Sequence, residues 1–252
     1  MLRELQWFKR RFSLLFLSVL VCLLVTVSQK TWPRGDEVSL PPLKPHPLPP
    51  TLAAWQSDYK EDYFDYLQSH PVGALIWYDF PVRVYLESPP DNLSPSGAKA
   101  FQQWRQAGKK AIAAWNPYIP LQETNNPEKA DILIYRQPPP VGRLRVNPET
   151  GLFDLPRVAA ATTTVQFYLR DSQLRHKMII RVNPNQNLDY LESNITHELG
   201  HALGIWGHSP SPQDIMYHAH TRDIPTISVR DINTLKRVYQ QPTRLGWRLS
   251  GN

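Results

Sequence analysis

The spacing of hydrophobic and polar residues separates an uncharged N-terminal run and a proline-rich stretch from a patterned C-terminal part. Alternation of apolar and polar residues, and short runs rich in β-branched residues, predict four strands, at residues 81–87, 131–135, 162–169 and 177–182. A serine cap before an Ala/Gln/Lys-rich run, which stops at Asn116-Pro117, predicts a helix from Ser94 or Ser96 to about Trp115. Apolar residues at helical spacing predict a second helix over 189–204, and a third is predicted over 228–239. This order of elements predicts an α+β, or mixed α/β, fold.

The uncharged run Phe12–Val27 follows a basic start, in which four of the first 11 residues are Lys or Arg and one is Glu. A positive flank before an apolar centre is typical of a targeting segment. A helix of this length would span about 24 Å, which is longer than the apolar part of a signal peptide requires and shorter than a comfortable bilayer span. We predict that residues 1–30 are a signal sequence or membrane anchor, and that the protein is extracytoplasmic, either anchored or secreted.

The next two segments differ in composition. Residues 31–50 contain seven of the 25 prolines, which predicts an extended linker. In residues 51–74, aromatic side chains recur at helical spacing with aspartates between them, which predicts a short amphipathic helix over 51–68. This pre-segment either docks on the following domain or inhibits it by bringing an acidic side chain to its active site. The patterned domain is predicted over 75–243, with a tail at 244–252.

Charge and cysteine content exclude several classes of function. The net charge is +6, but half of this excess lies in the first 11 residues, and no dense basic run follows. The sequence therefore predicts no nucleic-acid partner. The single cysteine, Cys22, lies in the apolar run, which excludes a disulfide framework and a cysteine-based metal cluster. A metal site in this chain must use His, Asp or Glu.

Residues 197–201 read His-Glu-Leu-Gly-His, within a predicted helix. Residues four apart lie on the same helix face, so His197 and His201 can bind one metal ion while Glu198 lies beside them as general base. The spacing of Asp189 and Glu192 predicts a capping pair at the start of this helix. An apolar side is predicted to hold the histidines in place, made of Leu191, Ile195, Leu199, Ala202 and Leu203.

A third ligand is expected because catalytic zinc takes three protein ligands and keeps one open position. Gly204 stands where the helix must end and the chain reverse, in a left-handed conformation that glycine tolerates, and His208 follows. In one large class of enzymes with a His-Glu-x-x-His motif, the third ligand is a downstream Glu. That arrangement is excluded here because no Glu follows Glu198. His208 is the favoured third ligand, and Asp214 is the alternative.

The segment HELGHALGIWGHS, followed by Asp-Ile-Met-Tyr at 214–217, resembles the metzincin zinc endopeptidases and their matrixin branch in particular. The family pattern has two residues between its glycine and its third histidine, whereas three separate Gly204 from His208. The resemblance extends over most of residues 76–241. It implies a twisted, mostly parallel sheet, an active-site helix and a C-terminal helix. It also implies that Met216 lies beneath the metal and that Tyr217 shapes the floor of the site.

The resemblance further implies one catalytic Zn²⁺ and a protein or peptide substrate bound along an edge strand within residues 162–169. Latency through a cysteine ligand is excluded by the absence of cysteine outside the apolar run. No residues are matched to the family's further zinc and calcium sites, and His176, His218 and His220 are read as isolated histidines. Two alternatives remain: an inactive zinc-bearing peptide-binding module, and a helix with two solvated histidines.

Overall fold

The computed structural model describes residues 40–140, 145–146, 153–154, 159–219 and 221–249. The predicted signal or anchor at 1–30 and the first part of the predicted linker lie outside the described residues. Within these ranges, no helix combines the length and the apolar character that crossing a membrane would need.

Five strands form the main sheet, in the order β2-β1-β3-β7-β6. The strands β2, β1, β3 and β7 are mutually parallel, and β6 pairs antiparallel with β7 at the edge. Their bounds are Val82–Leu86 (β1), Leu121–Glu123 (β2), Ile132–Tyr135 (β3), Ala161–Arg170 (β6) and Gln173–Val182 (β7). A separate antiparallel pair joins Arg145–Val146 (β4) to Phe153–Asp154 (β5). The mixed α/β class and the four predicted strands are confirmed, whereas β2, β4 and β5 are too short for a pattern to reveal.

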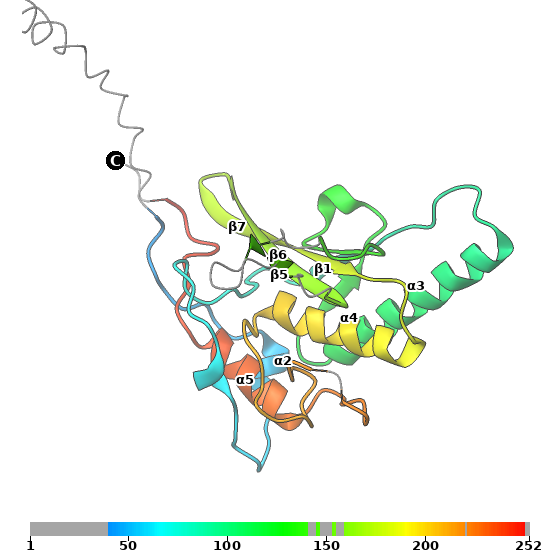
Figure 1. Ribbon diagram of the computed structural model, residues 1–252. Coiled ribbons are helices and arrows are strands. Elements are labelled where there is room, and N and C mark those ends of the chain that lie inside the picture. Colours follow the sequence, from blue (N-terminus) through cyan, green and yellow to red (C-terminus); the bar gives the residue numbers. More distant parts are fainter. Residues whose placement is uncertain (1–39, 141–144, 147–152, 155–158, 220, 250–252) are drawn as a thin grey trace, which may run out of the picture. The chain divides into compact units, whose positions relative to one another are not determined.

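The three long helices are α3 (Pro95–Trp115), α4 (Leu188–Leu203) and α5 (Val229–Tyr239), close to their predicted bounds. Helix α4 lies under the β6–β7 hairpin, with α3 beside it (Figure 1). Alternate residues of β7 are buried on the inner face of the sheet, among them Met178, Ile180 and Val182. The predicted apolar side of α4 is buried as well, so the core fixes the helix against the sheet.

The predicted cap of α4 is wrong. The N-cap is Asn187, whose side chain accepts a hydrogen bond from the backbone N–H of Asp189. An Asn side chain placed just before the first turn satisfies an amide that has no partner inside the helix. The cap therefore lies two residues earlier than the charge pattern indicated.

The helix predicted over residues 51–68 is also wrong. The structure has a short helix α2 (Pro50–Ala54) and one 3-10 turn η1 (Phe64–Tyr66). Trp55 donates from Nε1 to Oδ1 of Asn233 in α5 at 3.1 Å, and Tyr63 is buried against the same helix. Contacts with α5 at several points along its length favour an extended course, and these tertiary contacts outweigh the helical spacing of the aromatic residues.

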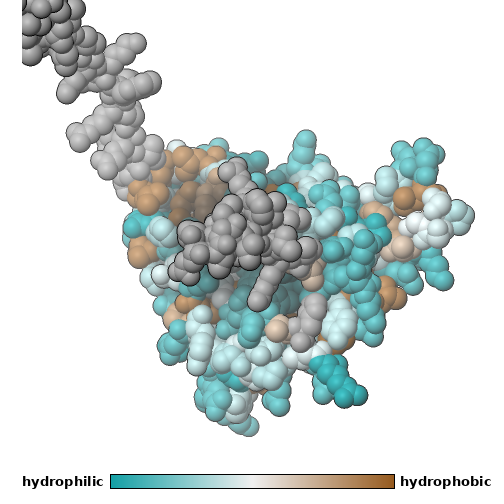
Figure 2. All heavy atoms as spheres, viewed as in Figure 1, coloured by the Kyte–Doolittle hydropathy of each residue, from teal (hydrophilic) through white to brown (hydrophobic). Residues whose placement is uncertain are grey.

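The described part of the predicted linker lies against the C-terminal residues. Lys44 forms an antiparallel bridge with Thr243, and the ring of His46 stacks on Trp247 with centroids 4.2 Å apart. Residues 39–252 form one compact unit, while its division at 50, 74 and 243 stays a prediction. The face of this unit seen in Figure 2 is mostly hydrophilic, which is usual for a folded domain.

His176 in β7 is a buried imidazole that makes stability depend on pH. Its ring lies 3.9 Å from that of Trp77, and burial lowers its pKa to about 3, against an opposing effect of Asp131. The neutral ring thus stabilises the fold above the ordinary pKa of about 6.5, and this stability is lost as pH falls toward 3. We expect His176→Phe to reduce the loss of unfolding free energy between pH 7 and 5 by about 2 kcal/mol. Urea unfolding of the wild type and of His176→Phe at pH 7 and pH 5 measures the two losses of unfolding free energy. Equal losses in the two proteins would contradict this prediction.

Candidate metal centre

Helix α4 places two histidines on one face, and the chain then reverses at the helix end. Gly204 has φ 128°, the positive value that was predicted from its place after the helix. Its N–H donates to the carbonyl of His201, and that of Ile205 donates to the carbonyl of Gly200. The following residues carry His208 back toward the helix, so the loop accommodates its extra residue.

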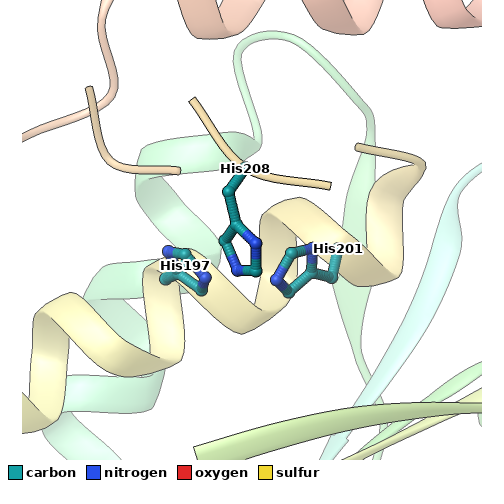
Figure 3. Close-up of side chains that lie close together, drawn as sticks. All are labelled: His197, His201 and His208. Atoms are coloured by element: carbon teal, nitrogen blue, oxygen red, sulfur yellow. The ribbon is translucent and has the colours of Figure 1, made fainter. Parts of the chain in front are cut away.

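The three predicted ligands converge. One ring nitrogen from each of His197, His201 and His208 lies within 4.8 Å of the others. Figure 3 shows the first two rings rising from α4 and the third reaching down from the loop above. Nδ1 of His197 lies 2.8 Å from the carbonyl of Ile215, and Nδ1 of His201 lies 2.7 Å from that of Ile205. Because a carbonyl only accepts, each Nδ1 carries the proton and each Nε2 carries a lone pair.

The lowered pKa values of His201 and His208 suit a metal ion. Burial, together with the neighbouring His197, lowers the pKa of His201 to about 3. Burial and the nearby His218 lower the pKa of His208. Metal ligands must be deprotonated, and three neutral imidazoles are a ligand set for zinc. The residues therefore fit a zinc ion.

Glu198 lies beside the three histidines and is buried, with 7% of its surface exposed. Thr163 of β6 donates from Oγ1 to Oε2 of Glu198 at 2.5 Å, with the backbone carbonyl of Glu198 3.0 Å away. Burial raises the pKa of Glu198 to about 7, against the lowering effect of the Thr163 hydrogen bond. A carboxyl group with a pKa near neutrality can both accept and release a proton, as a general base requires.

Met216 and Tyr217 follow the site in a turn that passes close to α4. Met216 is fully buried, and a side chain at Gly200 would collide with its sulfur. The backbone N–H of Ser209 donates to the carbonyl of Met216 at 2.9 Å, which joins this turn to the residue after His208. Met216 thus packs under the helix turn between His197 and His201, and Tyr217 lines the cleft.

Asp231 in α5 is fully buried and contacts the turn that follows the site. Its Oδ2 accepts from the backbone N–H of Ser228 at 2.7 Å and from that of Ile215 at 3.1 Å. Its Oδ1 accepts from the hydroxyl of Tyr63 at 2.6 Å. Because the carbonyl of Ile215 contacts His197, this one carboxylate connects α5 and the pre-segment to a predicted ligand.

We expect Asp231→Ala to lower the free energy of unfolding by about 3 kcal/mol, because buried donors on Tyr63 and Ile215 would lose their acceptor. Urea unfolding of the metal-free chain measures this loss. The exposed Asp223 offers a matched control, and Asp223→Ala should change stability by less than about 0.5 kcal/mol. A loss below about 1 kcal/mol for Asp231→Ala would contradict the role assigned to this carboxylate.

The other candidate ligands do not join this group of three histidines. Asp214 accepts from the Ser209 hydroxyl at 2.5 Å and lies 3.4 Å from Nη1 of Arg230. The His218 ring lies 6.4 Å from that of His208, His176 is buried under Trp77, and His220 is outside the described residues. Among the described residues, the three converging histidines are the group of His, Asp, Glu or Cys side chains that could hold a metal.

A cleft of about 610 Å³ runs over the three histidines and Glu198. The first residues of β6, Ala161–Thr163, form one wall. Another wall is formed by Ile215, Tyr217, His218, Ala219, Thr221, Ile224 and Pro225. The pre-segment adds Gln68. The cleft therefore follows the start of the edge strand β6 and is lined by all three histidines.

The roles of Thr163, Gln68 and Asp231 in this site were not predicted from the sequence. Thr163 was assigned only to a strand, and nothing in a run of three threonines shows which hydroxyl meets Glu198. Gln68 lies 140 residues before His208 and has no motif of its own. Ser228 and Asp231 carry the spacing of a capping box, which could have been recognised, but that spacing predicts only the contact with Ser228.

Comparison with known proteins agrees with this geometry. The sequence model of the matrixin family, a peptidase family, matches residues 94–240, which include α3, four of the five strands of the main sheet, the three histidines and α5. No curated protein matches the sequence. Because the family model covers more than half of the chain, this protein belongs to the matrixin family.

Proposed function

We propose that the protein is a zinc-dependent endopeptidase, with His197, His201 and His208 as the metal ligands and Glu198 as the general base. Membership of the matrixin family supports a zinc metallopeptidase. The observation that carries the finer assignment is the convergence of three histidines beside a buried carboxyl group in an open cleft. A peptide-binding module would need the ligands but has no use for Glu198, which makes catalysis the better account.

When bound, a zinc ion would polarise the carbonyl of the scissile peptide bond and acidify a water molecule. Glu198 accepts the proton of the attacking water at its carboxylate and then donates it to the nitrogen of the leaving amine. Thr163 orients this carboxyl group through Oγ1. The outer edge of β6, which pairs with no other strand among the described residues, binds the substrate backbone by strand addition, which keeps the peptide extended across the histidines.

The decisive experiment measures metal content and proteolysis together in the full chain. We expect one zinc per chain and cleavage of a reduced, alkylated protein. A chelator should abolish this cleavage, and added Zn²⁺ should restore it. A chain that binds one zinc but leaves the unfolded substrate intact would favour the binding module. A folded chain that binds no zinc would overturn the metal site itself.

The proposed location is extracytoplasmic, by anchoring or secretion, and it rests on the charge pattern of the first 30 residues. Protease added to intact cells tests it, since an exported domain is digested while a cytoplasmic marker is protected. Protection of the domain under conditions that digest a known exported protein would overturn this location.

A further inference from the structure

The pre-segment contacts the loop that carries the third predicted ligand. Leu67 forms an antiparallel bridge with Gly207, and the backbone N–H of Gln68 donates to the carbonyl of Trp206 at 2.9 Å. These contacts fall on the two residues that precede His208. A segment about 140 residues away in the sequence thus lies beside the loop where the family's spacing gains one residue.

The two backbones approach each other too closely for a side chain to lie between them. A Cβ atom at Gly207 would lie 2.9 Å from Cα of Leu67 and 3.0 Å from the carbonyl oxygen of Tyr66. Backbone atoms cannot move aside as the end of a flexible side chain can. Glycine at 207 is therefore needed for this contact.

His208 depends on its backbone for its position more than the other two histidines do. His197 and His201 project from α4, and each is oriented by a carbonyl at Nδ1. The His208 ring, by contrast, forms no hydrogen bond with the residues that the structure describes, and His208 is exposed. The loop is bound after His208 through Ser209 and Met216, and before it through Leu67 and Gln68.

The pre-segment is itself firmly attached, so it can act as a support. The backbone N–H of Tyr63 donates to Oγ1 of Thr234 at 3.0 Å, and its hydroxyl donates to Asp231. Tyr63 is 1% exposed. Asp62 pairs with Arg237 of α5 at 3.1 Å. Helix α5 therefore holds the turn that leads directly into Leu67 and Gln68.

We propose that the backbone of Leu67 and Gln68 positions His208 for metal binding, so that the pre-segment contributes to the geometry of the metal site. This inference rests on the proposed zinc site. The acidic residues Asp62 and Asp65 bind Arg237, and Gln68 is the residue of this segment that lines the cleft. The pre-segment thus contacts the loop before His208, and within the described residues it does not place an acidic side chain in the cleft, as the inhibitory alternative would require.

The test compares Gln68→Pro with Gln68→Ala in the full chain. Proline removes the N–H that Trp206 accepts from, while Leu67 already has the extended conformation (φ −81°, ψ 151°) that precedes proline without strain. Alanine keeps the N–H and removes only the side chain. We expect Gln68→Pro to weaken Zn²⁺ binding about 10-fold, as loss of a supporting contact does, and Gln68→Ala to stay within about twofold of the wild type.

Competition with a chelator of known affinity measures zinc binding, and unfolding of the metal-free chains verifies that each variant folds. The absorption spectrum of bound Co²⁺ adds a direct view of ligand geometry, which should change in Gln68→Pro alone. Wild-type affinity and spectrum in Gln68→Pro would overturn the inference, and so would equal losses in both variants.

If Gln68→Pro does not fold, Gly207→Ala decides the question by the same measurements, because its Cβ would push Leu67 and Tyr66 away. About 10-fold weaker zinc binding supports the inference, and unchanged binding overturns it. These results are distinguishable from failure of the proposed function, because in that case the wild-type chain would bind no zinc or would cleave nothing.

Discussion

Replacing Glu198 by glutamine is expected to lower kcat for peptide cleavage at least about a thousandfold while zinc binding stays unchanged. Glutamine has nearly the same shape and can still accept the hydrogen bond from Thr163, so the cleft should keep its form. It cannot accept a proton at neutral pH, and the attacking water would lose its base. Kinetics on an unfolded protein substrate, together with zinc content, measure both quantities.

The same substitution at Glu192 is the matched control. Glu192 lies on α4 as well, but it is partly exposed and forms an ion pair with Lys110 at 2.9 Å. A surface ion pair contributes at most about 1 kcal/mol, so Glu192→Gln should leave both kcat and zinc content near the wild type. If Glu198→Gln retained a tenth or more of the activity, Glu198 would not be the general base.

Replacing His208 by alanine is expected to weaken zinc binding more than about 100-fold. The chain would keep two of its three converging nitrogens, and the loss of a direct ligand should exceed the 10- to 100-fold loss that supporting residues cause. Cleavage should disappear at zinc concentrations that saturate the wild type. Competition with a chelator measures the affinity, and unfolding of the metal-free chain shows that the fold is kept.

Two controls separate His208 from the other candidates. His218 is exposed near the same cleft, and His218→Ala should keep zinc binding within about twofold, as expected for a residue outside the ligand set. Asp214→Asn should also keep zinc, because this carboxylate is engaged by Ser209 and Arg230. Loss of zinc in Asp214→Asn but not in His208→Ala would move the third ligand to Asp214.

Local patterns were sufficient for the elements that carry the site. The alternation in β1 and β7 and the 3.6-residue spacing in α3, α4 and α5 reflect burial of one face, which a linear sequence records directly. The His-Glu-Leu-Gly-His segment was equally readable, because one helix turn brings residues four apart together. Gly204 marked the end of that helix because glycine tolerates the positive φ with which the chain leaves it, and this property belongs to a single residue.

The fold class, the helix that bears two of the three predicted ligands, and the chemistry that its residues permit could thus be predicted from the sequence alone. Three features became visible only in the folded chain. His208, and not Asp214, joins the histidine cluster, Thr163 contacts Glu198, and residues 51–68 extend along α5. The fold also brings Asp231 to the backbone of Ile215 and Gln68 to the backbone of Trp206, next to the predicted ligands. The reason is physical: these are single contacts between segments that are distant in the chain, and a contact that does not repeat leaves no period in the sequence.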